Sequence, residues 1–140
     1  MKERDIIEGN KLIAKFIGGV TKDINSNNRG IAWISAHMDD DEINFNEEDY
    51  PETPHDGSCW KFNELRYHSS WDWLMPVVEK IEEIGETSKR YGTLCTIDTN
   101  HIRIGKITLD HKVKDYSTKI EGTWLAAVEF IKDYNLNNKT

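Results

Sequence analysis

Two tryptophan-bearing segments with helical spacing constrain this chain more than any other feature of its sequence. In residues 117–134, apolar side chains recur at offsets 0, 4, 7, 11 and 14, which line one face of a helix. Thr118 and Glu121 fit the capping box that begins such a helix. A helix with one apolar face must bury it against another layer, so we expect a folded domain. The face consists of Ile120, Trp124, Ala127, Ile131 and Tyr134.

The other tryptophan segment, residues 67–82, predicts a second amphipathic helix. A hydroxyl at Ser69 or Ser70 can accept hydrogen bonds from the N–H groups of the first turn. Pro76 lacks an N–H group, so we expect a distorted first turn or a helix that begins near Met75. Its broad apolar face comprises Trp71, Trp73, Leu74, Val77, Val78, Ile81 and Ile84, followed by Gly85 as the predicted end.

The remaining patterns complete an α+β reading. Apolar spacing predicts a first helix over residues 5–17, ended by glycines 18 and 19. Residues 31–36 and 59–67 read as two strands that pair as a long hairpin, and residues 91–109 read as an antiparallel meander. The predicted fold class is α+β: three helices packed around a small antiparallel sheet.

The domain prediction is a single domain over residues 1–140, which suits the size of one hydrophobic core. Within it, residues 37–58 form an acidic loop or insertion, and residues 135–140 form a frayed tail. No apolar run is long enough to cross a bilayer, and no leader with a cleavage site precedes the first helix. We therefore expect a cytoplasmic protein that does not enter membranes. Cys59 and Cys95 are expected to be buried free thiols, with a disulfide or a reactive thiol as the alternative.

The net charge of −7 is concentrated in one segment. Residues 39–56 contain nine acidic and no basic side chains, so the rest of the chain has 18 basic and 16 acidic residues, a balance of +2. Such a segment repels nucleic acid and favours cations or basic protein surfaces as partners. The candidate partner-binding residues are Asp40, Glu42, Glu47 and Glu48.

The same segment holds the best candidates for a metal site. His37, Asp39 and Asp41 could ligate a divalent cation, with His55 as a further ligand. The spacing does not fit a calcium-binding EF-hand, because the glycine position is Asn44 and the twelfth position is Tyr50. A solvated acidic loop explains these residues better than a metal centre, and no cofactor is predicted.

The start of the second helix holds the candidates for binding a small anion. Hydroxyl, imidazole, indole and guanidinium groups gather there in the sequence, and a helix N-terminus favours negative charge. Capping and core packing explain the same side chains without a ligand. The candidate ligand-binding residues are Arg66, Tyr67, His68, Ser69, Trp71 and, from the meander, Arg103.

Two segments of the sequence resemble those of a known protein family. The stretch Tyr67-His-Ser-Ser-Trp-Asp-Trp-Leu-Met-Pro76 and the stretch Trp124-Leu-Ala-Ala-Val-Glu-Phe-Ile131 are similar to small uncharacterised proteins of Bacteroidetes genomes and their phages. The pattern is also distantly similar to the phage alpha-beta-alpha sandwich domain. The resemblance covers about half of the chain, and residues 39–56 fall outside it. It implies a phage or prophage accessory protein of the bacterial cytoplasm, and it transfers no site residues.

The sequence contains no phosphate-binding loop, dinucleotide-binding glycine pattern or nucleophile elbow. Together with the localised charge, this absence leads us to expect a non-enzymatic binding protein. The resemblance implies that it is a phage or prophage accessory protein, or a counter-defence factor, that blocks a host protein or sequesters a small anionic ligand such as a nucleotide. The alternative is a divalent-metal-assisted hydrolase that uses the histidines and carboxylates of residues 37–56.

Tryptophan positions also predict self-association. Trp71 and Trp73 lie about 200° apart around a helix, because successive residues turn by roughly 100°. Both indoles cannot face one core, and an exposed tryptophan often marks an interface. We therefore expect a homodimer with two-fold symmetry whose contact includes the start of the second helix.

Overall fold

The computed structural model describes eight stretches of the chain, which together contain three α-helices and six strands. Contacts divide the chain into two compact units, Met1–Arg66 and Tyr67–Thr140, and each contains a three-stranded antiparallel sheet. The described residues are 2–23, 29–33, 51–55, 58–87, 95–98, 101–104, 107–110 and 116–137.

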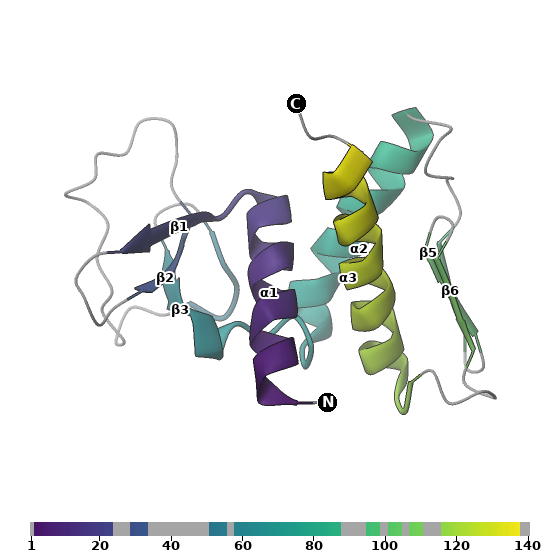
Figure 1. The fold of residues 1–140 in the computed structure, drawn as a ribbon, viewed down its shortest axis with the longest axis horizontal. Helices are drawn as coiled ribbons and strands as arrows, with labels where there is room; N and C mark the ends of the chain where they lie inside the picture. The colour runs from purple at the N-terminus through teal and green to yellow at the C-terminus, as the bar shows by residue number, and fades with distance from the viewer. Residues whose placement is uncertain are drawn as a thin grey trace. The chain divides into compact units, whose positions relative to one another are not determined.

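The first unit combines one α-helix with a sheet of strand order β1-β2-β3 (Figure 1). Helix α1 ends where Gly18 adopts a φ of 118°, a left-handed conformation that glycine tolerates best. The chain then enters β1, and Ile31 of β2 lies opposite Trp60 of β3. The elements are α1 (Glu3–Ile17), β1 (Val20–Asp23), β2 (Arg29–Ala32), β3 (Cys59–Lys61) and the short 3-10 helix η3 (Phe62–Glu64).

A buried hydrogen bond joins the two ends of this unit. The side-chain amide of Asn10 donates to the carbonyl of Leu65 at 3.1 Å, and both residues are 1% exposed. On the same side of α1, the ammonium of Lys11 lies 4.5 Å from the ring centre of Phe62. These contacts hold η3 against α1 although 55 residues separate the hydrogen-bonded pair.

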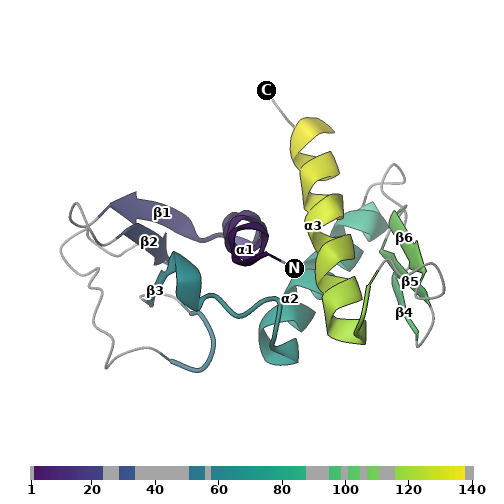
Figure 2. The same ribbon diagram turned by 60° about the horizontal axis from the view of Figure 1, so that its bottom comes forward.

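The second unit places two α-helices beside a sheet of order β4-β5-β6 (Figure 2). Helix α3 contacts β5, β6 and α2, so it joins the sheet to the other helix. The elements are α2 (Trp71–Thr87), β4 (Cys95–Ile97), β5 (His101–Ile104), β6 (Ile107–Asp110) and α3 (Lys119–Asn137).

Alternation along β5 and a glycine on α3 position the helix on the sheet. Ile102 and Ile104 are fully buried, whereas His101 and Arg103 are exposed on the opposite face. A Cβ added to Gly122 would lie 2.5 Å from Cδ1 of Ile102 and 2.6 Å from Cγ of Tyr116. Only a glycine therefore permits this approach between the helix and the strand.

The α+β class predicted from the sequence is confirmed, with three α-helices and antiparallel sheets. The strands are divided over two sheets rather than one: in the described ladders, β4, β5 and β6 pair only with one another. The hairpin pairing of the strands near residues 31 and 60 is also confirmed. The predicted extent of the second strand, residues 59–67, is wrong, because β3 ends at Lys61 and η3 follows it. The single domain over residues 1–140 remains a prediction.

Helix α2 departs from the sequence-based prediction at its proline and at its glycine. Helix α2 begins at Trp71, so the second of the two alternatives, a start near Met75, is wrong. Pro76 has no N–H group to donate to the carbonyl of Asp72, four residues earlier. The helix tolerates this loss because both residues are exposed, so water can bond to that carbonyl. The helix also continues through the buried Gly85 to Thr87.

At its start, α3 has the predicted cap: the backbone N–H of Glu121 donates to the hydroxyl of Thr118 at 3.2 Å. Trp124 is 2% exposed, as its place on the apolar face requires. The helix extends to Asn137, past the predicted start of the frayed tail, and the Asn137 amide donates to the carbonyl of Asp133 at 2.9 Å. Among the described helices, none is long and apolar enough to cross a membrane.

The close approach of α3 to β5 generates the first testable prediction. Gly122→Ala gains about 1 kcal/mol of helix propensity, but overpacking a filled core costs about 1–3 kcal/mol. Because the ring of Tyr116 cannot rotate away as a flexible chain end does, we expect the clash to exceed the gain. Because the added Cβ would meet both Ile102 and Tyr116, the cost should fall in the upper part of its range, and urea denaturation should show a net loss of about 1–2 kcal/mol.

The matched control is Asn135→Ala, an exposed position on the same helix, which should leave the unfolding free energy nearly unchanged. If Gly122→Ala is as stable as the wild type, the helix and the strand are further apart than described.

Candidate functional site

The start of α2 is where the sequence places the ligand-binding candidates. A turn over residues 67–69 precedes the helix, and the N–H of Leu74 donates to the carbonyl of Ser70 at 3.0 Å. Ser70 therefore occupies the N-cap position, one of the two that the sequence predicts. Arg66 and Ser69 are exposed, so both side chains are accessible at this end of the helix.

Tyr67 belongs to the interior rather than to an accessible surface. Its side chain is 2% exposed, and its ring meets that of Trp73 edge-on, with centroids 5.1 Å apart and planes at 82°. Burial also raises the pKa of its hydroxyl, because the phenolate would lose its hydration. These observations describe a core tyrosine that anchors the turn to α2.

The two tryptophans of α2 lie on opposite sides of the helix, as the sequence predicts. Trp73 is 3% exposed, whereas Trp71 is 37% exposed. One turn further along the same face as Trp71, Met75 is also 37% exposed. Pro76 is exposed beside it. The helix thus presents an apolar surface at its beginning while its other side lies in the core.

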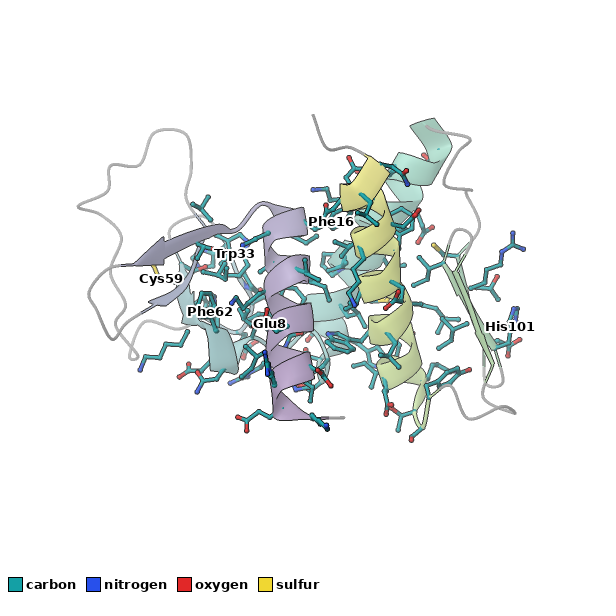
Figure 3. All side chains as sticks on the ribbon, viewed as in Figure 1. Glu8, Phe16, Trp33, Cys59, Phe62 and His101 are labelled. Atoms are coloured by element: carbon teal, nitrogen blue, oxygen red, sulfur yellow. The ribbon has the colours of Figure 1, made fainter. Side chains whose placement is uncertain are left out.

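Arg103, the candidate from the meander, lies on the outer face of the second sheet. It is on the middle strand, β5, where it lies opposite Thr96 of β4 on one side and Thr108 of β6 on the other. His101, two residues earlier on the same face, points away from α3 in Figure 3. Because Arg103 is on this outer face and Tyr67 is in the interior, the structure does not bring these two candidates into one site.

The metal and partner-binding candidates of the acidic segment lie outside the described residues. This applies to the predicted ligands His37, Asp39 and Asp41, and to the predicted contacts Asp40, Glu42, Glu47 and Glu48. His55, the further ligand, is exposed, and its backbone N–H and carbonyl both bond to the Ser58 hydroxyl, at 3.0 and 2.7 Å. Within the described ranges, no group of three or more histidine, cysteine, aspartate or glutamate side chains could hold a metal ion.

A second set of acidic residues, absent from the sequence-based candidates, lies on α2. Glu79 and Glu86 are exposed and Glu82 is half-buried. Together with Trp71 and Met75 they recur at offsets 0, 4, 8, 11 and 15, an arc of about 80° around the helix. We call these five residues the α2 outer stripe. The spacing alone could have revealed it, but the denser charge of residues 39–56 drew the prediction there.

Comparison with known proteins assigns no family. No family model, curated protein or solved structure matches this chain. The resemblance to phage and Bacteroidetes proteins therefore remains a hypothesis that rests on the two sequence segments, residues 67–76 and 124–131.

His68 gives the candidate region a testable pH dependence. Burial lowers the pKa of its imidazole below the ordinary 6.5, because the charged form loses hydration. The unfolded chain therefore binds a proton before the folded one does as the pH falls. The unfolding free energy should decrease as the pH falls from about 7 toward the lowered pKa, and level off below it.

The measurement is the unfolding free energy of the wild type and His68→Gln in urea at several values between about pH 7 and pH 5. Carboxylates contribute equally to both proteins, so the difference isolates His68. A flatter curve is expected for the variant, and parallel curves would contradict the assignment.

Proposed function

We propose that this protein is a non-enzymatic binding protein that recognises another protein through the exposed beginning of α2. The observation that carries the proposal is the exposure of Trp71, with Met75 one turn away. Tryptophan is the residue type most enriched among side chains that dominate binding energy in interfaces. An enzyme needs groups that converge on reacting atoms, whereas a binding protein needs only an accessible anchor of this kind.

The resemblance to phage and prophage proteins supplies the biological setting of the proposal. A phage accessory protein that binds a host protein can block it without any catalysis, which is the counter-defence role expected from the sequence. The sequence left two alternatives, blocking of a host protein and capture of a small anion, and the first is favoured. The reason is that Tyr67 is buried and Arg103 lies on the outer sheet face.

A capture experiment with bacterial host lysate tests the proposal. Trp71→Ala combined with Met75→Ala should lose the captured protein, because truncating an anchor residue typically costs about 2 kcal/mol or more of binding energy. Leu136→Ala is the matched control: it removes a large apolar side chain that is 68% exposed on α3. It should retain the captured protein.

Equal capture by both variants would contradict the proposed surface. A thermal-shift screen of cyclic and linear nucleotides runs beside it. Saturable stabilisation by a nucleotide, lost in Arg103→Ala, would favour the ligand-sequestering alternative instead. A homodimer through the same surface is tested by light scattering of the wild type and the Trp71 and Met75 variant.

A further inference from the structure

The charge of α2 is unfavourable for the helix itself. Five of its seventeen residues are acidic and one, Lys80, is basic. Glutamates at positions 82, 83 and 86 lie near its C-terminal end, where the helix dipole is negative, and the last turn has no basic residue. Like charges three or four residues apart repel one another as well. Lys89 and Arg90 follow in the sequence, outside the described residues.

The acidic side chains of the outer stripe are not neutralised inside the described part of the chain. Glu79, Glu82 and Glu86 have no ion pair there, in contrast to Glu8 of α1 and Glu129 of α3, which pair with lysines at 3.6 and 3.4 Å. A helix that served only to bury Trp73 and its neighbours would gain stability from neutral or basic residues at these positions. The placement therefore costs stability, and surfaces that act in binding commonly carry such costs.

We infer that the α2 outer stripe docks a basic amphipathic helix of the partner protein, an inference that rests on the proposed function. The apolar end, Trp71 and Met75, accepts apolar side chains at helical spacing, while the glutamates meet lysine or arginine. Charge complementarity favours this occupant over the others. Nucleic acid and anionic membrane carry the same sign as the stripe, and a second copy of α2 would bring glutamate against glutamate or aspartate.

The probe is a pair of synthetic helical peptides of equal length. The first has a leucine pair four residues apart, followed by four lysines at helical spacing; the second has glutamates in place of the lysines. Fluorescence anisotropy of the labelled peptides measures binding to the whole protein. We expect the lysine peptide to bind and to weaken as salt rises, because the exposed charges are then screened, and the glutamate peptide not to bind.

The decisive variant is the triple substitution Glu79→Gln, Glu82→Gln and Glu86→Gln. Three surface charge pairs of modest strength together change affinity by about tenfold, so the lysine peptide should bind about tenfold more weakly. The melting temperature should stay level or rise, because repulsion and the unfavourable dipole contact are removed. A structural role would lower the melting temperature.

The matched control is Glu3→Gln, Glu8→Gln and Glu129→Gln, which changes the net charge equally on exposed positions of α1 and α3. It should leave the affinity unchanged. Equal weakening in both triple variants would overturn the inference, since it would assign the effect to total charge. Equal binding of the two peptides would overturn it as well.

Two further outcomes separate this inference from the proposed function. If lysate capture depends on Trp71 but neither peptide binds, the proposed binding surface is supported, whereas the inference of a basic helix as its partner is contradicted. A stable dimer of the wild type that becomes monomeric in Trp71→Ala would assign the stripe to a second copy and overturn the inference.

Discussion

The turn of about 100° per residue in α2 is the constraint on which the second unit depends. It places Trp73 in the core beside Tyr67 and sends Trp71 to the opposite side, with Met75 one turn further along. No rotation of the helix can turn both indoles toward the same core. Because Leu74, Val77, Val78 and Ile81 share the inner side with Trp73, the core fixes which residues face outward.

Helix α3 has the same turn per residue but is buried on more of its sides than α2. It contacts the sheet on one side and α2 on another, and its middle residues are buried almost all around, from Gly122 to Ile131. Most of its surface therefore packs against other elements, whereas one side of α2 is exposed to solvent. The outer side of α2 holds features that a purely structural helix would avoid: Pro76 in its interior and glutamates at its C-terminal end. This contrast supports the assignment of recognition to α2.

Local patterns in the sequence predicted what depends on nearby residues. The helices follow from apolar spacing, the start of α3 from Thr118 and Glu121, and the meander from alternation around residues 95–110. The division of the strands into two sheets was not predicted, because strand pairing between distant segments leaves no local signal. The Asn10 bond to Leu65, which spans 55 residues, is such a distant contact. In the candidate site, helix geometry predicted that Trp71 and Trp73 could not both face one core, but it did not indicate which of them is exposed. Tyr67 was grouped with the ligand-binding residues because a hydroxyl gives no sign in sequence of whether it is buried.

The most direct test of the account is the solvent exposure of each tryptophan. Protein labelled with 5-fluorotryptophan gives one ¹⁹F resonance for each of its five tryptophans, and exposed indoles shift when H2O is replaced by D2O. Four tryptophans are at most 6% exposed and Trp71 is 37% exposed. We therefore expect one strongly shifted resonance, the one that disappears in Trp71→Phe. A Trp71 resonance that does not shift, or a strongly shifted Trp73, would contradict it.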